Sequence, residues 1–211
     1  MFHSYKRITG LMLAALLILA QLTALADSNV YTGQNDHGVG GTIRVEVTMD
    51  GETINKIKTV EQKETRGLGT TAIMQLTKDI VEKNSLDVDL VSGATLSSIA
   101  FLGAVRQAVE EATAYDPAAG VELGENEYLG ISNNGLGGRL MVKVKVEDGK
   151  ITAIDVLESY ESEEIGVVAL NTQIEKMVAS GSVETDVITG ATITCNALNE
   201  AVSEALASSQ K

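Results

Sequence analysis

Two stretches of the chain alternate apolar and polar residues, and a turn signal follows each. The first covers residues 42–49 and precedes Asp50-Gly51, and the second covers residues 140–147 and precedes Asp148-Gly149. Alternation with a period of two predicts strands that bury one face, and Asp-Gly is a typical hairpin turn. Each stretch therefore predicts an antiparallel hairpin that is covered on one side.

Apolar residues at helical spacing follow each predicted hairpin. They run from Ala72 to Val81 and from Ile99 to Ala112, and again from Ala169 to Val178 and from Leu198 to Leu206. This spacing predicts amphipathic helices that pack on the sheets. The side chains that can cap the last helix of each half are Ser97 or Ser98, and Thr194 or Asn196.

The two halves are copies of one domain. The stretch Asp89-Leu90-Val91-Ser92-Gly93-Ala94-Thr95 returns 97 residues later as Asp186-Val187-Ile188-Thr189-Gly190-Ala191-Thr192. The same spacing pairs other residues along the chain without a gap, and such a self-match determines the fold prediction. We predict an α+β protein of two tandem repeats, each a small antiparallel sheet covered by helices, with domains at 27–115 and 127–211 and a linker at 116–126.

The first 26 residues are typical of a secretion signal. Lys6 and Arg7 precede the apolar run Leu11–Ala20, and Ala24-x-Ala26 is a small-residue cleavage pattern. We expect a secreted or extracytoplasmic protein, and an uncleaved membrane anchor is the alternative. Without residues 1–26, which hold two basic residues and no acidic one, the formal net charge changes from −13 to −15. Such a charge argues against a nucleic-acid partner.

The remaining composition limits the chemistry. A single cysteine, Cys195, aligns with Ser98, so we expect a small residue at a helix start instead of a redox or metal ligand. Once the leader is removed, His37 is the one histidine, and we expect it in a loop. The Gly-rich residues 27–41 lack a phosphate-binding fingerprint and precede a strand, so we interpret them as a strand lead-in.

The repeated motif is predicted to lie in a turn that leads into a helix. At a helix N-terminus the first backbone N–H groups lack partners and the helix dipole is positive, which suits a phosphate. Gly93 and Gly190 would let another group approach the backbone, and Ala94 and Ala191 add little bulk. The hydroxyls of Thr95 and Thr192 would then lie beside a possible anion site. The alternative is that the turn only begins a helix.

At these residues the chain resembles the FMN-binding domains of extracytoplasmic flavoproteins, which include the C subunit of sodium-pumping NADH:quinone reductase and the G subunit of the Rnf-type complex. The family pattern is Asp-x-x-Ser/Thr-Gly-Ala-Thr, and both copies match it. The resemblance implies FMN esterified to the final Thr by a magnesium-dependent flavin transferase, at Thr95 and Thr192, and so up to two covalent FMN. It also implies recognition of Asp89 and Asp186 by the transferase, with Ser92, Gly93, Ala94, Thr189, Gly190 and Ala191 around the cofactor.

A second family element lies upstream, and the resemblance implies that it is near the flavin ring. It is Glu64-Thr65-Arg66-Gly67-Leu68-Gly69, from which we take Glu64, Thr65, Gly67, Leu68 and Gly69 as cofactor-binding residues. The second copy, Glu161-Ser162-Glu163-Glu164-Ile165-Gly166, departs from it. Glu64 and Glu161 could be general bases, but with no partner group nearby in sequence we expect solvated loop residues or neighbours of the flavin.

The resulting hypothesis is an electron carrier that shuttles electrons between a membrane donor and an external acceptor or reductase. A flavin supplies the redox chemistry, and the protein supplies attachment and orientation. Two alternatives remain open. One is a surface binding module without redox function, and the other is an accessory subunit of a membrane oxidoreductase.

Overall fold

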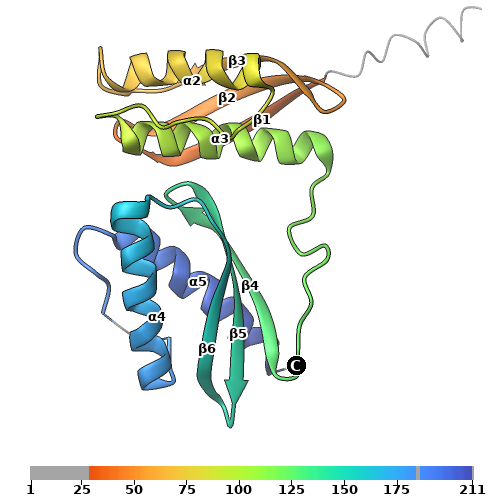
Figure 1. Cartoon of the computed structure of the whole chain (residues 1–211), viewed down its shortest axis with the longest axis vertical. Helices are drawn as coiled ribbons and strands as arrows, with labels where there is room; N and C mark the ends of the chain where they lie inside the picture. The colour runs from red at the N-terminus through yellow and green to blue at the C-terminus, as the bar shows by residue number, and fades with distance from the viewer. Residues whose placement is uncertain (1–28, 184–185, 211) are drawn as a thin grey trace, which may run out of the picture.

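The computed structural model describes residues 29–183 and 186–210, which form two repeats with the same order of strands and α-helices. Figure 1 shows the repeats stacked on each other, with the linker along one side. Repeat 1 contains β1 (Val30–Gly38), β2 (Gly41–Asp50), β3 (Thr53–Glu61), α2 (Gly69–Lys83) and α3 (Thr95–Thr113). Repeat 2 contains β4 (Glu127–Gly135), β5 (Gly138–Glu147), β6 (Lys150–Ser159), η1 (Glu163–Val167), α4 (Val168–Ser180) and α5 (Thr192–Ser208). The predicted tandem α+β fold is confirmed.

Each sheet has three antiparallel strands with the middle strand in the centre, in the orders β1-β2-β3 and β4-β5-β6. In β2 the predicted apolar face, Ile43, Val45, Val47 and Met49, is buried. The two helices of the repeat pack against this face. The alternation therefore predicted both the strands and the side that is covered.

The prediction for the Gly-rich segment was wrong. Residues 30–38 are not a lead-in but the edge strand β1, which pairs with β2 along most of its length. His37 was expected in a loop, and it lies in this strand with its Nε2 atom 3.1 Å from the carbonyl oxygen of Asn134 in repeat 2. Glycine, asparagine and aspartate weaken a strand prediction, and here pairing with β2 outweighs that local preference.

The last helix of each repeat lies close to its sheet through a row of alanines. These are Ala100, Ala104 and Ala108 in α3, and Ala197, Ala201 and Ala205 in α5, and all six are fully buried. The predicted caps were wrong, because the helices begin earlier. Ala94 and Ala191 occupy the N-cap positions, and Ser97, Ser98, Thr194 and Asn196 lie inside the helices.

The two repeats pack against each other through α3. In Figure 1 this helix lies on the side of repeat 1 that faces repeat 2. The tip of the β4–β5 hairpin approaches it, and Arg106 donates a hydrogen bond of 3.1 Å to the carbonyl of Gly137. The side chain of Asn35 donates to the carbonyl of Leu136 at 3.0 Å. The short linker thus joins two domains that form a common interface.

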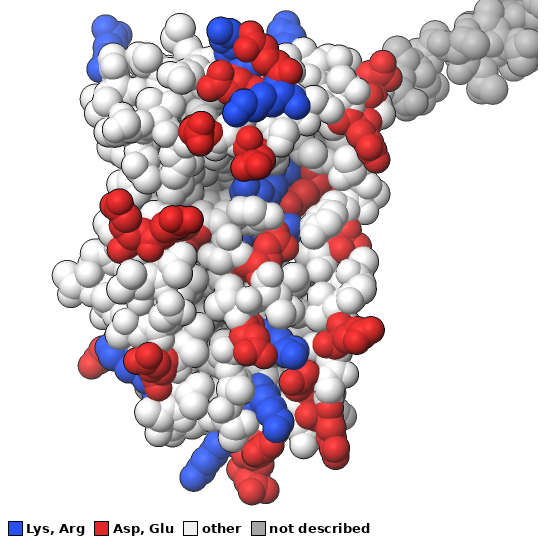
Figure 2. Space-filling view, in the orientation of Figure 1, with Lys and Arg blue, Asp and Glu red and all other residues white. Residues whose placement is uncertain are grey.

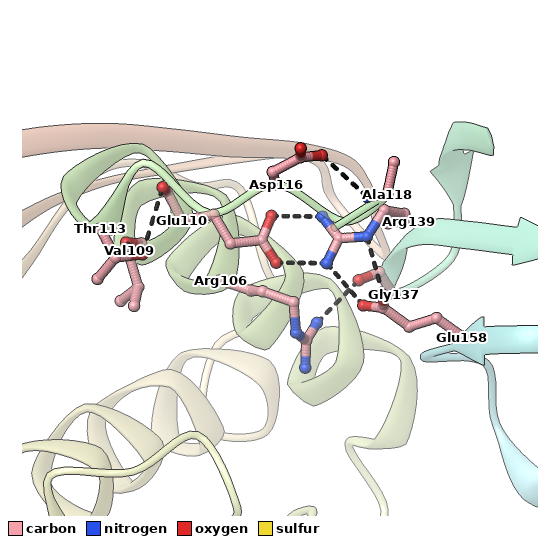
Figure 3. A network of polar contacts seen from close by, with 9 residues as sticks. All are labelled: Arg106, Val109, Glu110, Thr113, Asp116, Ala118, Gly137, Arg139 and Glu158. Atoms are coloured by element: carbon pink, nitrogen blue, oxygen red, sulfur yellow. Dashed lines mark hydrogen bonds and ion pairs between the residues drawn. The ribbon is translucent and has the colours of Figure 1, made fainter. Parts of the chain in front are cut away.

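Arg139 is the centre of this interface (Figure 3). Its guanidinium forms a bidentate pair with Glu110 of α3, with both N–O distances 2.7 Å, and a further pair with Glu158 of β6 at 2.6 Å. Burial would lower the pKa of Arg139, but the hydrogen bonds to both carboxylates outweigh it and raise the pKa above its ordinary value. Beside this group the Arg106 guanidinium lies 3.2 Å from the centre of the Tyr160 ring.

Among the described residues, no helix has the length and apolar character needed to cross a membrane. The predicted leader at residues 1–26 lies outside the described residues.

Candidate functional site

The repeated motif forms the same turn in both repeats. The Ala94 N–H donates to the Val91 carbonyl at 2.9 Å, and the Ala191 N–H donates to the Ile188 carbonyl at 3.0 Å. Between these residues Gly93 has φ +78° and Gly190 has φ +86°. Residues with a Cβ rarely adopt this left-handed conformation. The glycines are therefore needed for the backbone of the turn.

The turn delivers each threonine to the first position of a helix. Thr95 begins α3 and Thr192 begins α5, and both are exposed. Neither helix has a side-chain cap at its N-terminus, where the N-cap residue is alanine. The backbone N–H groups of the first turn are therefore not bonded by a capping side chain and can bind phosphate oxygens beside an exposed hydroxyl.

Ser92 and Thr189 are also exposed in these turns. Asp89 and Asp186 are exposed in the irregular segments that precede them. No strand ends at either aspartate. The structure thus leaves both carboxylates accessible from outside the protein.

Of the two roles expected for Glu64 and Glu161, solvated loop residue or neighbour of the flavin, the structure contradicts the first. The Glu64 side chain is buried, accepts a hydrogen bond from the Gly40 N–H at 2.9 Å, and accepts a short one from the Ser97 hydroxyl. In repeat 2 the half-buried Glu161 accepts from the Leu136 N–H at 2.8 Å and from the Thr194 hydroxyl at 2.5 Å. Each glutamate therefore holds the first turn of the motif helix against the loop and the hairpin.

The glycine that ends each loop makes room for this contact. A Cβ added at Gly69 would lie 2.8 Å from a Glu64 carboxylate oxygen and 2.9 Å from the Ser97 hydroxyl. At Gly166 it would lie 2.6 Å from the Glu161 Cβ. Retention of Glu and the last Gly in both copies is thus explained by packing.

In repeat 1 the predicted loop lies next to the motif. Thr65, Leu68 and Gly69 line a hollow of about 260 Å³ together with Gly93, Ala94 and Thr95. Gly67, at φ +76°, forms the turn of the loop, and its N–H donates to the Thr70 hydroxyl at 3.1 Å. The structure therefore brings the two sequence elements together.

In repeat 2 the corresponding loop has another conformation. Glu164 aligns with Gly67, and residues 163–167 form the π-helical turn η1 in place of a glycine turn. The Ser162 hydroxyl accepts a hydrogen bond from the Gly166 N–H at 3.1 Å and caps this turn. The departure seen in the sequence therefore changes the shape of the loop.

Sequence reasoning identified Leu68 but missed two other exposed apolar side chains near Thr95, Leu90 and Leu96, and we call the three residues the apolar rim. Each of these three side chains lines a hollow that Thr95 also lines, and the aligned residues of repeat 2 are Ile165, Val187 and Ile193. All six are exposed. The sequence did contain a signal for these residues, because both copies have an apolar residue at each of the three positions and these positions are not part of the helical core pattern. Such a rim fits an aromatic ring system attached nearby.

A larger hollow of about 630 Å³ also opens at Thr95, between the two repeats. We call it the interrepeat cleft. Its wall on repeat 1 runs along one face of α3 from Thr95 through Ile99 and Leu102 to Arg106. Its wall on repeat 2 is the segment 159–165.

Other groups in the fold have structural contacts. Cys195 is fully buried in α5, and its Sγ accepts a hydrogen bond from the Ile188 N–H at 3.4 Å, as the Ser98 hydroxyl does from the Val91 N–H at 3.3 Å. Within residues 29–183 and 186–210, no three His, Cys, Asp or Glu side chains are grouped so that they could hold a metal.

Comparisons with known proteins identify the same two segments. The family model described as the FMN-binding domain matches residues 38–110 and 135–207, more than half of the chain. The urocanate reductase of Eggerthella lenta is 45% identical over 74 residues, which cover 35% of this chain and 12% of that protein. The NADH:acrylate oxidoreductase of Vibrio harveyi is 34% identical over 84 residues, which cover 40% of this chain and 8% of that protein. The matched segments thus span about a tenth of the length of each relative.

Proposed function

The chain belongs to the family of FMN-binding domains, and from this membership we propose that it is an extracytoplasmic electron carrier with FMN esterified to Thr95 and Thr192. One observation carries the proposal. In both repeats a threonine hydroxyl is exposed at the first residue of a helix whose N-terminus has no side-chain cap. This geometry suits a phosphate that is esterified to the hydroxyl oxygen and hydrogen-bonded by the first-turn N–H groups.

The residues at each site fit an FMN group. The space beside Gly93 and Gly190 is open, because a Cβ there would meet only the Leu68 side chain at 3.6 Å and no atom within 4 Å, respectively, and in repeat 1 the apolar rim offers contacts to the ring. When bound, FMN supplies transfer of one or two electrons. The protein's own residues hold the phosphate, orient the ring and keep the motif helix in position through Glu64 and Glu161.

The presence of two FMN-binding domains in one chain favours an electron carrier. The relatives named for urocanate and acrylate reduction are about ten times longer than the segments matched here. We infer that the two FMN domains exchange electrons with separate redox proteins, a membrane donor and an external acceptor or reductase. Maturation would need a flavin transferase, for which the exposed Asp89 and Asp186 are recognition residues.

A second candidate concerns repeat 2, where η1 replaces the glycine turn of repeat 1. The altered loop favours a different environment for a flavin ring in repeat 2. Repeat 2 would then be a binding domain without a redox role. An accessory role in a membrane oxidoreductase complex is compatible with a redox role of repeat 2 and with a binding role.

The test is the intact mass of the protein after coexpression with a flavin transferase and export, with flavin fluorescence on a denaturing gel. We expect two additions, each equal in mass to FMN less one water, because the threonine ester replaces one hydroxyl group of the FMN phosphate and the threonine loses its hydroxyl hydrogen. Thr95→Ala and Thr192→Ala should each remove one addition. The matched control is Thr113→Ala, which removes an exposed hydroxyl at the other end of α3 and should leave both. An unmodified mass, with the transferase active on another substrate, contradicts covalent attachment.

A further inference from the structure

The interrepeat cleft connects the predicted attachment residue of one repeat to a loop of the other. Thr95 lies at the N-terminal end of the α3 face that forms one wall of this cleft, and residues Ser159–Ile165 form the opposite wall. The segment in the opposite wall includes residues 163–165 of η1, which align with the loop near the motif of repeat 1. A group attached to the Thr95 hydroxyl is therefore next to residues of both repeats.

The cleft has the surface that a planar aromatic ring requires. Leu90 and Leu96 of the apolar rim line it from repeat 1, and Ile165 lines it from repeat 2. Leu90 is 41% exposed, Leu96 is 47% exposed and Ile165 is 57% exposed. Contact with an aromatic ring would remove this apolar surface from water, which is favourable. At about 630 Å³ the cleft has the size of a typical cofactor pocket, whereas the hollow beside the Thr65–Gly69 loop measures about 260 Å³.

We propose that the FMN site of repeat 1 is composite, and that the segment Glu161–Ile165 of repeat 2 forms one wall of the pocket for its ring. The proposal rests on the proposed attachment of FMN at Thr95. Repeat 2 then sets the redox potential of the flavin that repeat 1 carries.

The interface holds this wall in place. Tyr160 precedes the segment and stacks on Arg106, which lines the same cleft from α3. Next to Tyr160, Glu158 is fixed by Arg139, which is fixed in turn by Glu110 of repeat 1. The start of the wall is thus tied to α3 by charged contacts on two sides.

The wall also gives the cleft an acidic side. Glu163 and Glu164 are exposed and line the cleft, and Figure 2 shows acidic side chains on the repeat 2 side of the boundary, over the start of α4. The other charged groups that line it are Glu161, whose carboxylate is hydrogen-bonded to Thr194 and Leu136, and Arg106. Because reduction adds negative charge to a flavin ring, exposed carboxylates beside it oppose reduction and lower its potential.

The experiment uses the full chain with Thr192→Ala, so that one flavin, on Thr95, is observed. Intact mass first establishes that this flavin is attached. Glu163→Gln with Glu164→Gln is then added, and the midpoint potential is measured by spectroscopic titration. We expect the reduced-to-oxidised ratio at a fixed potential to increase about tenfold, which is about 30 mV for a two-electron couple.

The matched control is Glu147→Gln with Asp148→Asn, which removes two acidic groups at the β5–β6 turn, outside the set of residues that line the cleft. It should leave the potential unchanged. An attached flavin whose potential responds equally to both double variants, or to neither, overturns the composite site and leaves the proposed function intact. A protein without FMN on Thr95 overturns both.

A second measurement probes the wall directly. Ile165→Ala shortens an exposed side chain, so the fold is retained, and we expect acrylamide to quench the fluorescence of the Thr95 flavin about twofold more efficiently. The control is Val168→Ala, an exposed apolar residue of the same segment of chain that does not line the cleft. Equal quenching in the two variants is evidence against a ring that contacts repeat 2.

Discussion

Replacement of Arg139 by glutamine should weaken the interface between the repeats. The Arg139 side chain is 6% exposed and makes four hydrogen bonds to Glu110 and Glu158. Removal of one partner from a buried ion pair costs about 3 to 5 kcal/mol, because the remaining charge stays buried without compensation. Here the two carboxylates retain some contact with water, and Arg106 lies close enough to interact with both. We therefore expect the lower value, a loss of about 3 kcal/mol.

The assay is urea unfolding followed by far-ultraviolet circular dichroism, because the chain contains no tryptophan. Arg44→Gln is the matched control, since Arg44 forms a pair with Glu61 on the surface of repeat 1 and both side chains are about 40% exposed. Exposed pairs contribute about 0 to 1 kcal/mol. If Arg139→Gln costs no more unfolding free energy than Arg44→Gln, the interface does not depend on this ion pair and the reasoning fails.

Two further predictions concern the carboxylates of Glu64, which is buried, and Glu158, which is half-buried. Ser97→Ala removes the hydroxyl that donates to Glu64 and leaves a buried acceptor without this donor. The free energy of unfolding in urea should fall by about 1 to 3 kcal/mol. An unchanged urea midpoint would contradict the role of this contact. The pKa of Glu158 lies below its ordinary value, because hydrogen bonds to Arg139 and Tyr160 outweigh the opposing effect of burial. Its stabilising contribution is therefore complete above the unfolded-state pKa of about 4.3 and is lost as pH falls through the lower folded pKa. The stability difference between wild type and Glu158→Gln should accordingly shrink on acidification, and a difference that is constant from pH 6 to pH 3 would refute this assignment.

The sequence predicted the parts of the fold that depend on regular spacing. Alternation in residues 42–49 and 140–147 placed the central strands, and helical spacing placed the four long helices. It missed β1 because glycine and asparagine weaken a strand signal, and the strand forms by pairing with β2. The helix starts were misplaced because capping rules expect a polar residue, whereas Ala94 and Ala191 occupy those positions.

At the candidate site, the repeat located the motif but not the contacts that hold it. Glu64 and Ser97 are 33 residues apart, and their hydrogen bond depends on how the loop packs against α3. Leu90 and Leu96 of the apolar rim were missed because an exposed leucine does not differ from a core leucine in sequence. In both cases tertiary packing determines the role of the residue.

The differences between the copies explain how the two domains are joined. Three charged residues of the interface have no charged counterparts in the other repeat: Arg139 aligns with Thr42, Arg106 with Ser203, and Glu110 with Ala207. The contacts therefore form only between α3 of repeat 1 and the sheet of repeat 2, and the reverse pairing lacks these charges. Gly103 shows the same asymmetry, because a Cβ there would lie 2.8 Å from the Gly137 carbonyl. In repeat 2 the aligned residue is Glu200, whose carboxylate accepts hydrogen bonds from Ser132 and Asn134 of its own sheet. The helix of repeat 2 therefore cannot receive a hairpin as α3 does. Residues shared by the copies form the two candidate FMN sites, whereas residues that differ place repeat 2 against the site of repeat 1.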